Sequence, residues 1–164
     1  ALFGDGAASV VVSGDEVENS GPRIIAAQST IWPDSLDIMG WNIVSEGMQV
    51  VFSRRIPAIV KKYMAENLQD FLKEHGLDLQ DIKHIIAHPG GAKVIEAYEQ
   101  ALNLTNGKMD ISRAVLRKYG NMSSVTVLFV LNEYLRNGNV TPNDLGIITA
   151  LGPGFSSESL LIKF

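Results

Sequence analysis

Three loops of this sequence carry side chains that can do chemistry, and each adjoins an apolar segment. The first is residues 88–91, His-Pro-Gly-Gly, directly after the apolar run 82–87. Ligands of α/β proteins bind at such strand ends, where an imidazole can donate a hydrogen bond to a carbonyl oxygen or pair with a thiolate. The two glycines let a substrate approach the backbone. Taken alone, His88 is more simply explained as a satisfied histidine beside an ordinary turn.

The second loop is residues 120–124, Gly-Asn-Met-Ser-Ser, before a strongly apolar segment. Asn121 offers an amide donor at a helix N-terminus, where the helix dipole favours developing negative charge. Capping of that helix by Asn121, Ser123 or Ser124 is the structural alternative. The third loop, residues 151–155, can line a pocket, but on its own it is typical of a tight turn.

Metal chemistry has little support. His84 and His88 share one face of the expected strand, but no third ligand accompanies them and the chain has no cysteine. Zinc sites need three or four such ligands. We therefore predict no metal site, and the missing cysteine excludes a disulfide or a cysteine nucleophile within these 164 residues.

The elements that must position these loops follow from the apolar patterning. Strand-like patterns cover residues 7–12, 24–32, 82–87, 146–151 and 157–164, and a hairpin with a turn at 45–47 is expected over 41–52. Helical spacing predicts helices from Pro57 to before Gly76, over 94–102, over 112–118, and from Ser123 or Ser124 to Arg136, before Asn137 and Gly138. Alternating strands and helices predict a single α/β layered domain, residues 1–164.

Composition excludes several classes of protein. Fourteen basic residues against 18 acidic ones give a net charge of −4, and no basic block occurs. We therefore expect no nucleic-acid partner and no binding to anionic membranes. No apolar run reaches the roughly 18–20 residues of a membrane helix, so we expect no membrane insertion and a cytoplasmic location.

The chain lacks an initiator methionine and starts and stops inside apolar patterns, which is typical of a piece of a longer protein.

The three loops, in this order and spacing, resemble the type III polyketide synthases, the chalcone and stilbene synthase family of the thiolase superfamily. Residues 2–8 (Leu-Phe-Gly-Asp-Gly-Ala-Ala) and 28–35 (Gln-Ser-Thr-Ile-Trp-Pro-Asp-Ser) match as well, so the likeness covers essentially the whole chain. A ketoacyl carrier-protein synthase III usually has His-Gln-Ala-Asn where this chain has His-Pro-Gly-Gly. The resemblance implies the C-terminal, thiolase-like half of such an enzyme, with a mixed, mainly parallel sheet layered with helices.

The resemblance also implies a chemistry. The family's catalytic set is a cysteine, a histidine and an asparagine, of which the last two align with His88 and Asn121, whereas the cysteine belongs to the N-terminal half. In the family, that thiolate takes an acyl group from an acyl-CoA, the imidazolium keeps it charged, and malonyl-CoA is decarboxylated to an enolate that extends the chain. CoA thioesters are the substrates, no cofactor is needed, and homodimers are usual. This chain alone is then expected to be inactive.

Some aligned positions depart from the plant enzymes. Val50 stands where those enzymes have a phenylalanine between the CoA tunnel and the cavity, and Trp41 stands where they have a glycine. Leu151 also replaces a phenylalanine. The resemblance therefore favours bacterial chalcone synthase-like and alkylpyrone synthases, with fatty acyl starters and pyrone products. The implied substrate-binding residues are Trp41, Val50, Ser123, Leu151, Gly152, Pro153 and Gly154, with helix capping the alternative role of Ser123.

Two other functions stay open. One is a different condensing enzyme of the superfamily, which takes malonyl groups from an acyl carrier protein. The other is a non-catalytic interaction domain, since these residues hold no nucleophile. If a partner half normally covers an apolar surface, the isolated chain should also self-associate.

Overall fold

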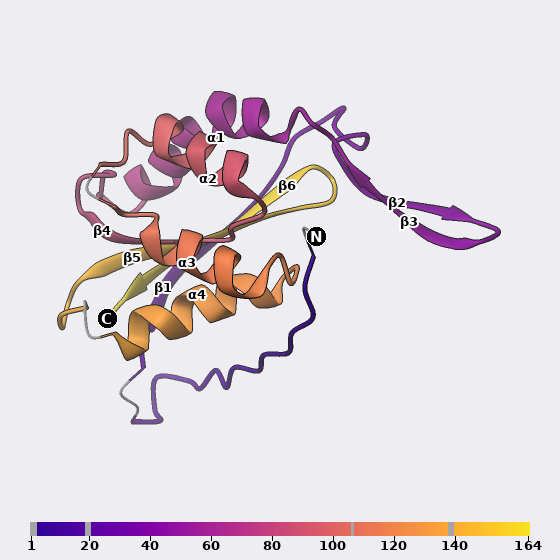
Figure 1. Cartoon of the computed structure of the whole chain (residues 1–164). Coiled ribbons are helices and arrows are strands. Elements are labelled where there is room, and N and C mark those ends of the chain that lie inside the picture. The colour runs from indigo at the N-terminus through magenta and orange to yellow at the C-terminus, as the bar shows by residue number, and fades with distance from the viewer. Residues whose placement is uncertain (1–2, 19–20, 106, 138–139) are drawn as a thin grey trace.

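Strands and helices alternate along most of the chain (Figure 1). The computed structural model describes residues 3–18, 21–105, 107–137 and 140–164, so Ala1, Leu2 and Gly138 of the patterns above lie outside the described residues. The elements are β1 (Arg23–Ile31), β2 (Met39–Val44), β3 (Gly47–Phe52), α1 (Ile56–Lys73), β4 (Ile82–Ala87), α2 (Ala92–Ala101), α3 (Asp110–Tyr119), α4 (Val125–Arg136), β5 (Leu145–Gly152) and β6 (Ser156–Lys163).

Four strands form one sheet in the order β1-β6-β5-β4. Strands β4 and β5 are parallel, whereas β5 pairs antiparallel with β6 and β6 antiparallel with β1. These pairings leave β1, β4 and β5 running in one direction and β6 in the other, so the expected α/β class with a mixed, mainly parallel sheet is confirmed. Strand β6 is reversed because the short connection at residues 153–155 returns the chain antiparallel, while a parallel partner needs a long crossover.

Helices cover the two faces of this sheet and make two cores. Val60, Met64 and Leu68 of α1 are buried against one face, together with residues of α2 and with Ile85 and Ile147 of the sheet. On the other face, α4 packs on alternate sheet residues such as Ile86 and Ile162. The 3–4 spacing therefore places the apolar residues of α1 on one face, as predicted, and alternate strand residues point into the two different cores.

Most predicted elements are confirmed within a few residues. Pro57 lies in the first turn of α1, and Gly76 just beyond its end has a φ of 70°, a conformation that favours glycine. The hairpin β2–β3 turns at Ser45 and Glu46. Ser124 occupies the predicted N-cap position of α4, but its side chain makes no capping hydrogen bond, so the predicted cap bond is wrong at Ser124. A different bond orders this helix start: the Met122 N–H donates to Thr126 Oγ1 at 2.8 Å.

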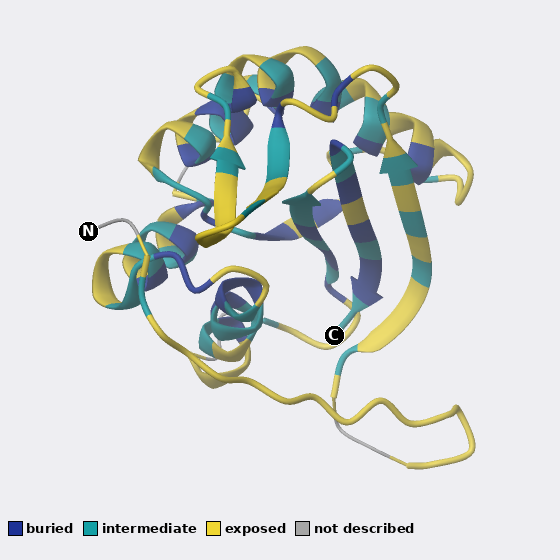
Figure 2. Cartoon of the chain, turned by 90° about the vertical axis from the view of Figure 1, so that its right-hand side faces the viewer, coloured by how far each residue is buried: buried dark blue, intermediate teal, exposed yellow. Residues whose placement is uncertain are grey.

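The strand expected over residues 7–12 does not form in this chain. These residues lie in an exposed segment without regular structure, in which Val11 is 95% exposed (Figure 2). The described residues contain no strand paired with it. A β-branched sequence forms a strand only where a partner satisfies its backbone groups, so its absence here reflects the missing partner rather than the wrong residue types.

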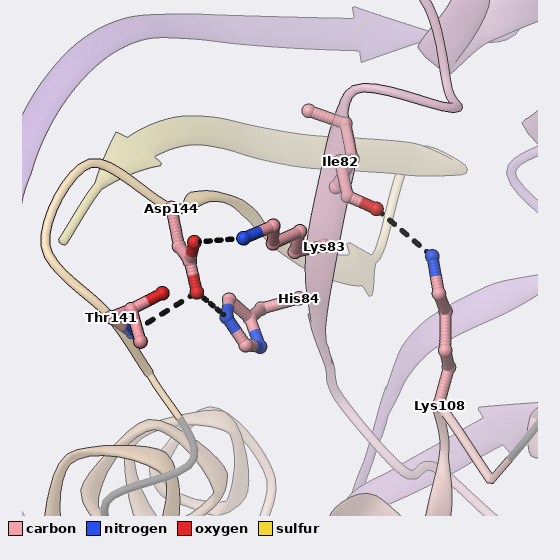
Figure 3. A network of polar contacts seen from close by, with 6 residues as sticks. All are labelled: Ile82, Lys83, His84, Lys108, Thr141 and Asp144. Atoms are coloured by element: carbon pink, nitrogen blue, oxygen red, sulfur yellow. Dashed lines mark hydrogen bonds and ion pairs between the residues drawn. The ribbon is translucent and has the colours of Figure 1, made fainter.

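A polar network holds the start of β4 (Figure 3). The buried Asp144 carboxylate accepts from Lys83 Nζ at 2.5 Å and from the Thr141 N–H at 3.0 Å, and pairs with His84 Nε2 at 2.9 Å. The Lys83 bond, followed by those of His84 and Thr141, holds the pKa of Asp144 well below its usual range. In the described ranges, no three His, Asp or Glu side chains gather in a way that could hold a metal ion. In the same part of the chain, no helix is long and apolar enough to cross a membrane.

Candidate active site at the ends of the parallel strands

The site begins where β4 ends. The His88 N–H donates to the Thr149 carbonyl of β5 at 2.8 Å, which extends the parallel pairing by one residue. Just before it, the Ala87 carbonyl accepts from the buried Ser112 hydroxyl of α3 at 2.9 Å. The backbone at His88 is therefore fixed by both a neighbouring strand and a covering helix.

The imidazole of His88 is mostly buried and incompletely bonded. Its Nδ1 is buried and has no hydrogen-bond partner among the described residues. Burial lowers the pKa of His88 from 6.5 to about 4, because the charged ring would lose its hydration. Buried polar atoms are nearly always paired, so an unpaired ring nitrogen at a strand end marks a functional candidate.

Asn121 is held in one orientation beside this loop. Its side chain is 2% exposed, its Nδ2 donates to the Gly90 carbonyl at 3.1 Å, and its Oδ1 accepts from the Ser123 N–H at 2.9 Å. The Nδ2 group has two hydrogens, and within the described residues only one of them is bonded. The site thus offers an unpaired imidazole nitrogen and a spare amide N–H from two loops that the fold brings together.

The turn at residues 152–154 lies at the same edge of the sheet, because β4 and β5 run parallel and β5 leads into it. Its anchor is Phe155, whose N–H donates to Ser35 Oγ at 2.6 Å and whose carbonyl accepts from the Trp32 N–H at 3.0 Å. The rings of Trp32 and Phe155 also stack, with centroids 5.7 Å apart. Leu151, at the end of β5, packs partly buried against the first core.

The remaining predicted substrate residues lie farther out. Trp41 and Val50 are cross-strand partners in β2–β3 and are 55% and 44% exposed. Their hairpin projects from the body of the chain (Figure 1). Ser123 is exposed beside Asn121, with a φ of 58°. The structure therefore gathers His88, Asn121 and the 152–154 turn at one edge, but places Trp41 and Val50 on a separate projection.

One neighbour of the site was not predicted from the sequence. Phe3 forms an isolated parallel bridge with Asn121, and the Gly4 N–H donates to the Asn121 carbonyl at 3.0 Å. The Phe3 ring also meets Phe52 of β3 edge-on, with centroids 6.1 Å apart. The available signal was a pair of glycines, Gly4 and Gly6, in a segment without a helix or a turn pattern to explain them.

The fold is similar to that of solved type III polyketide synthases. PKS-I of the brown alga Ectocarpus siliculosus matches with a TM-score of 0.81 and 27% identity, over 91% of this chain and 41% of that one. The 1,3,6,8-tetrahydroxynaphthalene synthase of Streptomyces coelicolor A3(2), a bacterial type III polyketide synthase, matches with a TM-score of 0.85 and 27% identity, over 90% and 42%.

Sequence comparison defines the family. Residues 23–164 match the model of chalcone and stilbene synthases, C-terminal domain, so the chain belongs to the chalcone and stilbene synthase family. It is 43% identical to the "Putative chalcone synthase" of Bacillus subtilis (strain 168) over 99% of this chain and 46% of that protein. It is 39% identical to the 1,3,6,8-tetrahydroxynaphthalene synthase of Streptomyces peucetius subsp. caesius, over 100% and 44%. The chain spans about half the length of these relatives.

Proposed function

We propose that this chain is the C-terminal part of a type III polyketide synthase that condenses an acyl-CoA starter with malonyl-CoA. The observation that carries the proposal is the pair of unused polar groups at one sheet edge: buried Nδ1 of His88 and a spare N–H of Asn121. The nucleophile would be a cysteine of an N-terminal half, because this sequence has none. The full-length enzyme is the polypeptide that joins both halves.

The chemistry follows from those two donors. The cysteine thiolate attacks the starter thioester and releases CoA, so the acyl group becomes bonded to sulfur. Malonyl-CoA then loses carbon dioxide, and the electron pair of the broken C–C bond is delocalised onto the thioester oxygen as an enolate. His88 and Asn121 donate to that oxygen. The enolate carbon attacks the acyl carbonyl, the C–S bond breaks, and the thiolate returns. One such donor is worth about 2.7–4 kcal/mol in the transition state.

The charge of His88 depends on its partner. Burial alone lowers its pKa to about 4, which leaves the ring neutral at pH 7 in this chain. A thiolate within about 4–6 Å stabilises the protonated ring and raises its pKa, so the cysteine-bearing half would restore the imidazolium. The same ion pair would lower the pKa of the thiol and activate it as the nucleophile.

The starter pocket is the finer part of the proposal. Val50 and Leu151 are smaller than the phenylalanines of the plant enzymes at the aligned positions, and Trp41 is larger than their glycine. A cavity changed in this way favours long, flexible acyl chains over a flat phenylpropanoid. We therefore propose fatty acyl-CoA starters and pyrone products, made by a homodimer, for the full-length enzyme.

The test is a product assay with radiolabelled malonyl-CoA on the full-length enzyme. Starters would be acyl-CoAs of graded length and coumaroyl-CoA. Lipophilic pyrones that disappear in Asn121→Ala but persist in Asn132→Ala, an exposed asparagine on α4, support the proposal. A preference for coumaroyl-CoA overturns the starter assignment alone, and malonyl carrier protein as the better donor indicates the carrier-protein enzyme. No decarboxylation with any starter overturns the whole proposal.

One observation favours a second candidate. The sequence contains no cysteine, so the 164 residues by themselves lack the nucleophile of the acyl-transfer cycle, which favours a binding or scaffolding role for this chain alone. Finding the cysteine-bearing half in the same open reading frame would reject a stand-alone interaction domain.

A further inference from the structure

The segment from Phe3 to Gly6 lies directly against the backbone that carries Asn121. Phe3 is bridged to Asn121, and the Gly4 N–H is the hydrogen-bond donor to the Asn121 carbonyl at 3.0 Å. From Asn121 the chain of bonds continues through its Nδ2 to the Gly90 carbonyl, in the loop of His88. Residues 3–6, which are far from the site in sequence, are therefore hydrogen-bonded directly to Asn121. Through Asn121 they are also connected to the loop that carries His88.

Two glycines make this approach possible. A Cβ at Gly4 would overlap the carbonyl oxygen of Tyr119, and a Cβ at Gly6 would overlap Sδ of Met122. At Gly6 it would also lie 3.2 Å from Met122 Cγ and 3.3 Å from Cγ1 of Val125, the first residue of α4. Neither glycine has a φ in the left-handed region, so close packing rather than backbone conformation requires glycine here.

We propose that residues 3–6 are a strap that positions Asn121, with Gly4 and Gly6 as its positioning residues. The loop under the strap needs such support. Gly120 and Ser123, on either side of Asn121, both have positive φ values, 75° and 58°, and α4 begins without a side-chain cap at Ser124. The strap bonds the Asn121 carbonyl and closes over Tyr119 and Met122, so it fixes the backbone from which the amide reaches Gly90.

The two glycines should differ in consequence. At Gly6 the obstacle is a thioether in a flexible side chain, which can move aside at modest cost. At Gly4 the obstacle is a backbone carbonyl, so an added methyl group must lift the strap and break its bond to Asn121. A displacement of about 1 Å at a catalytic group can cost about 10²-fold in rate.

The activity test rests on the proposed function and uses the full-length enzyme. Gly4→Ala should lower kcat for malonyl-CoA decarboxylation by about 10²-fold, with KM little changed, and Gly6→Ala should lower it by about tenfold. Gly14→Ala is the matched control, because Gly14 lies in the same segment with nothing within 4 Å of an added Cβ. Met122→Val, which lacks an atom at the sulfur position, should rescue Gly6→Ala but not Gly4→Ala. A general loss of folding would show no such selective rescue.

A second readout separates the strap from the proposed function. In this 164-residue chain, hydrogen exchange of the Gly4 amide should be slower than that of the Gly14 amide, and Gly4→Ala should shift the Asn121 side-chain amide resonances. Equal exchange at Gly4 and Gly14, or glycine variants as active as Gly14→Ala, overturns the strap. If Asn121→Ala keeps full activity while Gly4 stays protected, the proposed function fails and the strap contact stands.

Discussion

Strand β4 carries a histidine near each end, and the two differ in how they are bonded. His84 pairs with the Asp144 carboxylate, and its ring lies edge-on against Tyr134 and Phe164 at 5.5 and 5.3 Å. His88, four residues later, has a buried Nδ1 without a partner in the described part of the chain. The histidine at the first end is bonded to a carboxylate through Nε2, whereas the one at the second end keeps a buried ring nitrogen unused.

This difference identifies which end does chemistry. A paired buried histidine stabilises the native state, while an unpaired one lowers stability and needs another reason to be there. The backbone at His88 is nevertheless held by two hydrogen bonds, one to the Thr149 carbonyl and one from Ser112 to the adjacent Ala87 carbonyl. Firm positioning with unused donors is the arrangement expected of a site that binds a developing oxyanion.

The largest expected effect is on catalysis by the full-length enzyme. Replacing His88 with Gln should lower kcat for malonyl-CoA decarboxylation by about 10²–10³-fold, the loss that follows removal of one oxyanion donor. His84→Gln should leave kcat near that of the unaltered enzyme, because that ring serves the other end of the strand. Steady-state rates with malonyl-CoA measure both. Equal losses in the two variants would remove the functional distinction between the histidines.

The next effect is a pH dependence of stability in this chain. The unfolded chain binds a proton at His88 below its ordinary pKa of 6.5, but the folded chain does so only near a pKa of about 4. The free energy of unfolding therefore falls as pH drops from 6.5 to 4, by about 3 kcal/mol from this group, and is unaffected above 6.5. Urea unfolding of the unaltered chain and of His88→Gln isolates this contribution. Identical pH slopes in the two proteins would contradict it.

A smaller effect is expected at the paired histidine. His84→Ala removes a buried ring, its two edge contacts and its bond to Asp144, so the free energy of unfolding should fall by about 2 kcal/mol. His75→Ala replaces an exposed histidine beyond the end of α1. It should change the free energy of unfolding by about 1 kcal/mol at most, as other surface substitutions do. Thermal or urea unfolding of this chain compares them. A His84 variant as stable as the His75 variant would mean that the network does not hold the strand.

Local patterns were sufficient for most of the fold. Helix α1 was predicted from apolar periodicity, because it buries one face, and strand β4 from a short continuous apolar run, because both of its faces are buried. Strand direction has no such local signal: the mainly parallel sheet was implied by the family resemblance, and it depends on which strands the turns connect. The strand predicted over residues 7–12 was wrong for a related reason. Its residue types favour a strand, but a strand also needs a neighbouring strand to pair with.

In the candidate site, too, some features were predicted from local sequence patterns and others depend on the fold. The sequence indicated His88 and Asn121 as candidates because their loops flank apolar elements. Taken alone, however, the His88 loop is explained equally well by an ordinary turn and the Asn121 loop by helix capping. The bond from Asn121 Nδ2 to the Gly90 carbonyl joins residues remote in sequence, so no local pattern predicts it. The packing of Gly4 and Gly6 on Tyr119 and Met122 is likewise invisible until the fold is known.

The smallest effect concerns the hairpin, which contrasts with both ends of β4. Val50 faces solvent opposite Trp41, so Val50→Phe should alter the stability of this chain by no more than about 0.5 kcal/mol. In the full-length enzyme, the added ring should disfavour long acyl-CoA starters relative to short ones by about tenfold in kcat/KM. Gln49→Phe adds the same ring to the neighbouring position, which points to the opposite face of the strand, and should not change the preference. Competition between starters of two lengths measures the ratio, and an equal shift in both variants would mean that the hairpin does not select the substrate.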